Sequence, residues 1–226
     1  MRYESIHPAV FLYRPNRFIA HVQLDGEPVI CHVKNTGRCR ELLIPGCTVY
    51  VQKCAGEKRK TQWDLIAVEK GQRLINMDAA APNAVFDEYL HSGGLGFVPQ
   101  LIKPECRHGD SRFDFYFEHN GRPAFAEVKG VTLEEDGIVR FPDAPTERGV
   151  KHLRGLAACA AEGFEAYAVF VVQMRTVRYF EPNRLTHPAF ADALLAARDA
   201  GVQILALDCH VRPDQITIAE PVPVRL

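Results

Sequence analysis

Turn-forming clusters divide the first eighty residues into runs that are too short for long helices. Arg14-Pro15-Asn16, Asp25-Gly26 and Pro45-Gly46 each combine residues that favour tight turns. The runs between such clusters are rich in β-branched and aromatic residues, and they predict strands over residues 10–13, 18–24, 29–34, 48–53, 65–69 and 74–77. Five or six short strands without a long helix are typical of a small barrel, so an OB-like fold is predicted here.

The pattern changes at Asp78-Ala79-Ala80-Ala81-Pro82, where we place a domain boundary. Residues 1–81 form the predicted barrel and residues 82–226 a second domain. In the second domain the sequence predicts helices over residues 82–90, 146–162 and 188–200, strands over 111–118, 124–131, 168–172 and 203–207, and a hairpin turn at Glu135-Asp136-Gly137. Hairpins followed by alternating strands and helices indicate a mixed α/β sheet flanked by helices.

Charge is distributed unevenly between the two parts. The whole chain carries a net charge of −1, which argues against a uniformly basic nucleic-acid-binding protein. Residues 1–80 contain 12 basic and 8 acidic residues, whereas the remainder contains 15 and 20. A basic first part and an acidic second part indicate different tasks. The alternative is that so small a basic excess reflects an ordinary solvated surface.

The sequence also bears on the compartment. No apolar run approaches the ~18 residues of a membrane span, and the first residues lack the basic and then apolar pattern of a secretory signal. The seven cysteines are odd in number and include no C-x-x-C pair, so reduced thiols are expected. We therefore expect a cytoplasmic protein without a membrane partner. Its oligomeric state, monomer or dimer, stays open.

The predicted hairpin of residues 111–131 places two acids face to face. Asn120-Gly121 is a strong two-residue turn, and a loop of that length pairs residue 119 with residue 122. Counting outward, Asp114 lies opposite Glu127 with Cβ atoms about 5 Å apart, and Lys129 points to the same side. A three-residue loop with a bulge would instead send one acid to the other face.

Two opposed carboxylates repel each other unless one is protonated or a cation lies between them. Hard divalent ions such as Mg²⁺ or Mn²⁺ take oxygen ligands of this kind, and a lysine holds a phosphate oxygen as a point charge. Asp114, Glu127 and Lys129 are therefore candidate catalytic residues for metal-dependent phosphodiester hydrolysis. The alternative is a solvated hairpin face without chemistry.

Basic clusters mark candidate nucleic-acid contacts. Small barrels bind nucleic acids through loops whose cations take phosphates while an aromatic ring stacks on a base. The helix predicted from residue 146 adds cations at its N-terminus, where anions bind favourably. The candidates are Arg14, Arg17, Lys34, Asn35, Arg38, Lys58, Arg59, Lys60, Arg148, Lys151 and His152. The alternatives are plain solvation and helix capping, and Trp63 is interpreted as a core residue rather than a stacking platform.

Several stretches together match a known family. They include Asn35-Thr36-Gly37-Arg38, Ser111-Arg112-Phe113-Asp114, the run from Glu127 to Leu133, and above all the run from Phe141 to Leu153. On these residues the chain resembles the sugar fermentation stimulation protein A (SfsA) family over nearly its whole length. The resemblance implies an N-terminal OB-fold, a C-terminal domain of the PD-(D/E)xK nuclease type, non-specific DNA binding and a regulatory role in sugar use.

The resemblance also implies roles for single residues. Asp114, Glu127 and Lys129 take the Asp, Glu and Lys positions of the nuclease pattern, with Mg²⁺ or Mn²⁺ as the expected metal. The preceding helix would supply a further metal ligand, Glu88, with Asp87 as its rival. Phe113 stands where the pattern often has a proline.

Two functions from different classes follow. One is a non-specific DNA-binding protein with a metal-dependent nuclease site, and the other is a non-enzymatic DNA-binding transcriptional regulator with a vestigial nuclease fold. The carboxylate–lysine set favours the first, and the sequence shows no helix-turn-helix to support sequence-specific regulation. Nothing in the sequence distinguishes DNA from RNA as the ligand.

Overall fold

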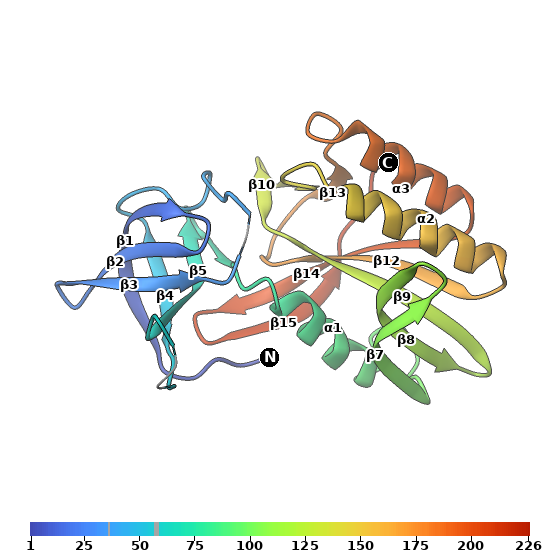
Figure 1. The fold of residues 1–226 in the computed structure, drawn as a ribbon, viewed down its shortest axis with the longest axis horizontal. Coiled ribbons are helices and arrows are strands. Elements are labelled where there is room, and N and C mark those ends of the chain that lie inside the picture. Colours follow the sequence, from blue (N-terminus) through green and yellow to red (C-terminus); the bar gives the residue numbers. More distant parts are fainter. Residues whose placement is uncertain (36, 57–58) are drawn as a thin grey trace.

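Two lobes of different construction make up the protein (Figure 1). The structure is a computed structural model, and it describes residues 1–35, 37–56 and 59–226. The candidate residue Lys58 therefore lies outside the described residues.

The first lobe is a closed barrel. Its strands are β1 (Ile6–Asn16), β2 (Ile19–Leu24), β3 (Glu27–Val33), β4 (Thr48–Lys53), β5 (Trp63–Lys70) and β6 (Arg73–Asn76). They run in the order β3-β2-β1-β4-β5-β6, and a parallel pairing of β3 with β5 closes the sheet. Alternate side chains such as Val49, Val51 and Leu65 point inward and are fully buried, as the barrel requires. The predicted OB-like barrel is confirmed.

The second lobe is built on a mixed six-stranded sheet in the order β15-β14-β12-β9-β8-β7. Its strands are β7 (Leu101–His108), β8 (Ser111–His119), β9 (Arg122–Val131), β12 (Glu165–Val172), β14 (Gln203–Arg212) and β15 (Gln215–Pro221). The three central strands β9, β12 and β14 run parallel. A small second sheet contains β10 (Leu133–Glu135), β11 (Ile138–Phe141) and β13 (Tyr179–Pro182).

Helices cover both faces of this sheet, which confirms the predicted α/β architecture. The helices are α1 (Ala81–His91), α2 (Glu147–Ala161) and α3 (Pro188–Asp199). α2 and α3 lie side by side on one face, and α1 lies on the other (Figure 1). Phe170 packs toward α3, whereas its neighbours Val169 and Val171 pack on the side of α1. A strand buried on both faces has this continuous apolar sequence.

Both edge strands of the large sheet, β7 and β15, were missing from the sequence prediction. Most side chains of β7 are exposed or half-buried, so the strand shows no apolar periodicity. It also contains Pro104 and, at Glu105, a positive φ of 56° that interrupts its pairing with β8. Proline and bulges are tolerated on edge strands because one side of the backbone faces solvent.

The first residues of the chain lie against the second lobe rather than the barrel. Tyr3 packs in the same cluster as α1, and Arg2 forms a bridge with Gln215. The amine of Met1 donates to Glu88 Oε2 at 2.6 Å and to the carbonyl of Ile216 at 3.0 Å. The N-terminal segment therefore crosses from one lobe to the other.

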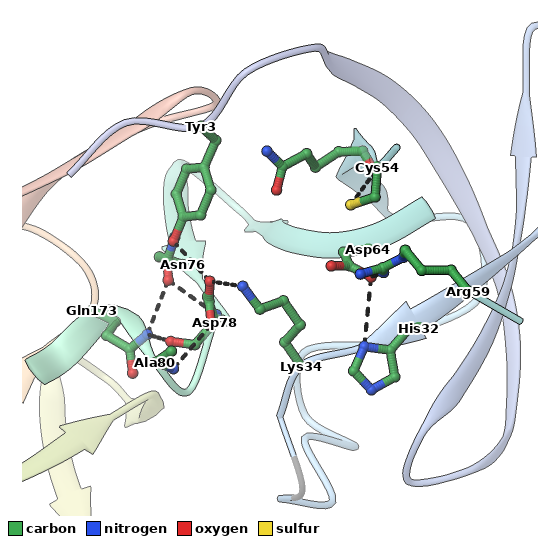
Figure 2. Close-up of polar contacts among 11 residues, drawn as sticks. Tyr3, His32, Lys34, Cys54, Arg59, Asp64, Asn76, Asp78, Ala80 and Gln173 are labelled. Atoms are coloured by element: carbon green, nitrogen blue, oxygen red, sulfur yellow. Dashed lines mark hydrogen bonds and ion pairs between the residues drawn. The ribbon is translucent and has the colours of Figure 1, made fainter. Parts of the chain in front are cut away.

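A buried polar network joins the lobes where β6 leads into α1 (Figure 2). Lys34 of the barrel pairs with the fully buried carboxylate of Asp78. Asp78 Oδ1 also accepts from the backbone N–H of Ala80 at 2.9 Å. Gln173, just after β12, donates to Asn76 Oδ1 and to the carbonyl of Asp78, both at 3.0 Å. Each buried polar group thus has a partner from another segment, which fixes the lobes relative to each other.

Lys34→Met tests this network. The substitution leaves the Asp78 carboxylate buried without its cation, so the free energy of unfolding is expected to fall by about 3 kcal/mol. Urea unfolding followed by the fluorescence of Trp63 measures it, since this is the one tryptophan of the chain. Adding Asp78→Asn removes the unpaired charge and restores part of the loss. The exposed control Lys103→Met is expected to change stability by less than about 0.5 kcal/mol.

Candidate functional site

The hairpin of β8 and β9 has the predicted register. Its pairs run from His119↔Arg122 to Phe115↔Ala126 around the Asn120-Gly121 turn. Asp114 and Glu127 are the next residues outward, one on each strand. The pairing of the two strands ends before them. The backbone N–H of Val128 donates instead to Oδ2 of the Asp114 carboxylate, at 2.7 Å.

Asp114 lies between the sheet and α1. Its Oδ1 accepts from Nδ2 of Asn83 on that helix at 3.1 Å. Burial and the nearby charge of Glu127 raise the pKa of Asp114 above its usual value, while the Val128 N–H, Lys129 and Asn83 oppose the rise. One member of the acid pair therefore has a raised pKa, as the opposed carboxylates predict.

Glu127 is almost completely buried, with 4% of its surface exposed. Its Oε1 contacts both the ammonium of Lys129 and Nδ1 of His152. Burial alone would raise the pKa of Glu127, but the hydrogen bond from His152 and the charge of Lys129 hold it below its usual value. The second oxygen, Oε2, is buried and has no hydrogen-bond partner among the described residues.

His152 belongs to this carboxylate site, which corrects its predicted role as a nucleic-acid contact. It is 5% exposed, and its Nδ1 contacts Oε1 of Glu127. Nε of Arg148 donates to its Nε2 at 3.4 Å, which leaves the proton on Nδ1 for Glu127. The helical spacing of His152 from Gly149 and Leu156, both buried, is the sequence signal that would have revealed this.

The start of α2 is fixed by a cap. Thr146 accepts from the backbone N–H of Gly149 at 3.0 Å through its side-chain oxygen. The apolar residues Val150, Leu153 and Leu156 then pack toward the sheet. This packing carries His152 down to Glu127 and leaves Arg148 and Lys151 exposed at the helix start.

The helical acid is the second correction. Glu88 is 54% exposed, and its carboxylate is paired with the N-terminal amine instead of facing Asp114. Asp87 lies beside His91 at 3.6 Å. Residues advance by about 100° around a helix axis, so Glu88 faces away from Asn83, five residues earlier. The α1 side chain that hydrogen-bonds to Asp114 is the amide of Asn83.

Gly130, which follows Lys129 in the chain, lines a cavity of about 160 Å³. Both lobes line it, with Asn35 and Gly37 from the barrel and Arg140, Asp143 and Gln173 among the residues from the second lobe. A Cβ on Gly37 would lie 2.6 Å from Oδ2 of Asp143. A larger residue at this position would have to displace the Asp143 side chain, so the barrel loop and the second lobe approach each other closely here.

Some of the predicted basic residues of the barrel form ion pairs or hydrogen bonds within the protein, and the others are exposed. Lys34 is paired with Asp78, and Arg59 with the buried Asp64. Arg14 donates to the backbone carbonyls of Asn16, Arg17, Asn35 and Arg38, so it braces two loops. Arg17, Arg38 and Lys60 are exposed. Trp63 is half-buried and packs edge-on against His7, with ring centroids 5.2 Å apart.

Comparison with known proteins decides the family. Residues 12–77 match the SfsA N-terminal OB domain, and residues 80–215 match the sugar fermentation stimulation protein RE domain. The chain belongs to the sugar fermentation stimulation protein family. The SfsA resemblance predicted from the sequence is thereby confirmed, together with an OB domain followed by a restriction-endonuclease-like α/β domain.

Relatives within this family match the chain over its full length. It is 58% identical over 226 residues to the sugar fermentation stimulation protein homolog of Desulfitobacterium hafniense, covering 100% of this chain and 99% of that one. The homolog of Clostridium beijerinckii is 54% identical, with full coverage of both chains. The solved structure of Pyrococcus furiosus SfsA in complex with Ca²⁺ gives a TM-score of 0.89 at 29% identity, covering 100% and 98% of the two chains.

Two further properties of this SfsA family member concern membranes and metal ions. No helix in the described part of the chain is long and apolar enough to cross a membrane. Among residues 1–35, 37–56 and 59–226, no group of three or more His, Cys, Asp and Glu side chains is placed to hold a metal ion. A metal at the acid pair would therefore have two carboxylates and take its remaining ligands from water or substrate.

The raised pKa of Asp114 predicts a pH effect in metal-free protein. A carboxyl whose pKa is raised by folding binds its proton more tightly in the native state than in the unfolded chain. The native state therefore loses stability as the pH rises from the unfolded pKa to the folded one, and the loss is complete above the folded pKa. Asp114→Asn removes this penalty, so its stability relative to wild type should be higher at pH 8 than at pH 4.

Urea unfolding at both pH values in the presence of EDTA measures this difference. The control is Asp110→Asn, which replaces an exposed acid at the β7–β8 turn. Its effect on the free energy of unfolding should be the same at both pH values. If the stability of Asp114→Asn relative to wild type does not depend on pH, the raised pKa of Asp114 is contradicted.

Proposed function

We propose that this SfsA family member binds nucleic acid without sequence specificity and hydrolyses phosphodiester bonds at Asp114, Glu127 and Lys129 with Mg²⁺ or Mn²⁺. The observation that carries the proposal is Oε2 of Glu127, a buried carboxylate oxygen without a partner among the described residues. Buried polar atoms are rarely left unpaired, and an absent ion is one of the few explanations. Asp114, whose pKa is raised by burial and then by the charge of Glu127, supports the same reading.

The donor set fits a hard divalent cation. Carboxylate oxygens are the ligands that Mg²⁺ and Ca²⁺ prefer, and Mg²⁺ commonly uses one or two carboxylates and keeps several waters. The relative from Pyrococcus furiosus is described in complex with Ca²⁺. The proposed ligands are Asp114 and Glu127, and Glu88 is left out because its carboxylate is engaged by the Met1 amine.

The side chains have distinct roles in this proposal. A divalent ion held here neutralises phosphate charge and acidifies a water molecule. His152 contacts Oε1 of Glu127, which leaves Oε2 as the oxygen available to an ion. Lys129 contacts Glu127 when nothing else is bound, and its ammonium is the group that would turn to a phosphate oxygen of the substrate. Asn83 and the Val128 N–H fix the rotamer of Asp114.

Nucleic-acid binding is assigned to the exposed cations of both lobes. Arg17, Arg38 and Lys60 lie on the barrel, and Arg148 and Lys151 lie at the start of α2, one turn or less from His152. Contacts from such groups to phosphates position a nucleic acid without reading its sequence. Residues 1–81 are therefore proposed as the main binding domain and residues 82–226 as the nuclease-like domain.

A second candidate function is a non-enzymatic DNA-binding regulator. The observation that favours it is that Lys129 and His152 already satisfy one oxygen of Glu127 without any metal. The relatives' name refers to the stimulation of sugar fermentation, so genes of sugar metabolism would be its targets. Metal dependence separates the two functions.

Metal-dependent stability and cleavage test the nuclease proposal. Millimolar Mn²⁺ or Mg²⁺ should raise the melting temperature of wild type and support DNA cleavage. Binding at one hundred times the dissociation constant adds about 2.7 kcal/mol to the free energy of unfolding. Asp114→Asn should abolish both effects and leave DNA affinity nearly unchanged, because binding depends on cations elsewhere. Asp110→Asn, as control, should retain both effects.

Thermal melts with increasing metal, paired with cleavage assays on DNA and RNA, provide the test. A wild type that shows neither a metal-dependent shift nor cleavage at millimolar metal would overturn the nuclease proposal in favour of the regulator.

Substitution of the exposed barrel arginines tests their proposed contacts with phosphates. Arg17→Ala combined with Arg38→Ala should weaken binding to unrelated DNA sequences alike. The slope of log K against log salt should fall by about one to two. The matched control removes two exposed arginines of the second lobe, Arg107→Ala with Arg212→Ala, and should leave the slope unchanged. Titrations at several salt concentrations measure it, and an unaltered slope in the first variant would remove these loops from the binding surface.

A further inference from the structure

An exposed aromatic stack lies on the outer face of the barrel. Tyr13 of β1 is paired across the sheet with His21 of β2. Their rings are stacked, with centroids 4.3 Å apart and planes within 11°. Tyr13 nevertheless remains 53% exposed. The imidazole thus holds the phenol ring in one orientation without burying it, which is the arrangement of a stacking platform.

The same tyrosine lines a groove of about 350 Å³, a volume within the range of small-ligand sites. Apolar side chains of Phe11, Leu43 and Pro45 contribute to the lining. Four arginines complete it, and the lining includes no acidic residue. The arginines are Arg14, Arg17, Arg38 and Arg40.

The groove is held in shape by one of these arginines. The guanidinium of Arg14 donates at 2.6 Å to the carbonyl of Arg17 and at 2.9 Å to that of Arg38. It therefore ties together the two loops that carry the other cations. Arg17, Arg38 and Arg40 are exposed and take part in no ion pair within the described part of the chain. Their charge is available to an anionic ligand.

We infer that this groove binds single-stranded nucleic acid, with a base stacked on Tyr13 and the adjoining phosphates on Arg17, Arg38 and Arg40. Aromatic rings bind any base through its π-face, and cations along a groove follow the backbone. A duplex cannot use this site in the same way, because stacking within the helix already covers the faces of its bases. The inference rests on the proposed nucleic-acid binding and specifies the strand form and the residue that recognises it.

Binding of fluorescent oligonucleotides to the full-length protein tests it. The probes are oligo(dT), oligo(U) and a mixed-sequence DNA duplex of equal length, and fluorescence anisotropy measures the affinities. Wild type should bind the single strands more tightly than the duplex. Tyr13→Ala should lower single-strand affinity about tenfold, since stacking contributes that much per base, and should change duplex affinity little.

Two further variants keep the outcome interpretable. Tyr13→Phe retains the ring and should keep the single-strand affinity. Val10→Ala, on the same strand with 41% exposure, should have no effect on either probe. Tighter binding of oligo(dT) or of oligo(U) identifies DNA or RNA as the source of the strand, and either supports the inference.

The inference and the proposed function fail in different ways. A duplex preference in wild type, or an equal loss of single-strand and duplex affinity in Tyr13→Ala, overturns the single-strand site and leaves nucleic-acid binding intact. Absence of binding to all three probes overturns the proposed nucleic-acid binding itself.

Discussion

The buried carboxylate of Glu127 is the constraint to which the rest of the second lobe responds. A charge at 4% exposure is costly unless donors surround it. Lys129 supplies one donor from the same strand, and His152 supplies the other from α2. The helix can reach the strand only because Thr146 caps it in the right place and its apolar face packs on the sheet. One acid therefore fixes the position of α2 over β9.

Asp114 forms a similar contact with the other helix, α1. The β8–β9 ladder ends at Phe115↔Ala126, and the next acid takes the backbone N–H of Val128 and the amide of Asn83 on α1. Two carboxylates that repel each other are thus held by contacts to two different helices, Asp114 to α1 and Glu127 to α2. The partial relief is visible in their opposite pKa shifts, raised for Asp114 and lowered for Glu127.

Sequence reasoning succeeded where local rules decide the structure. The Asn120-Gly121 turn fixed the hairpin register, and apolar periodicity with capping signals placed α1, α2 and α3 to within one residue at each end. It failed where partners come from distant segments. The edge strand β7 has no buried face that apolar periodicity could reveal. The contact of Asn83 rather than Glu88 with Asp114 depends on where the N-terminal amine folds back.

Arginines show the same limit within the binding surface. Sequence alone treats Arg14 and Arg17 alike, because both flank Pro15 in a turn. In the structure Arg14 uses its guanidinium on four backbone carbonyls, whereas Arg17 is exposed. The planar arginine guanidinium has five N–H donors. They can bind carbonyl oxygens that converge from two loops as well as phosphate oxygens. Only the fold decides which arginine orders the groove and which faces the ligand.

In the proposed function the two lobes have different tasks, attraction of the nucleic acid and hydrolysis. The barrel region has the basic excess, and the second lobe has the acidic one, so a polyanion is attracted to the first and repelled by the acid pair of the second. In the proposed function a divalent cation reverses that repulsion locally, because it replaces net negative charge with positive charge beside the phosphate. Binding then needs no metal, whereas cleavage does. Residues of both lobes line the 160 Å³ cavity, where the barrel loop at Gly37 meets Asp143.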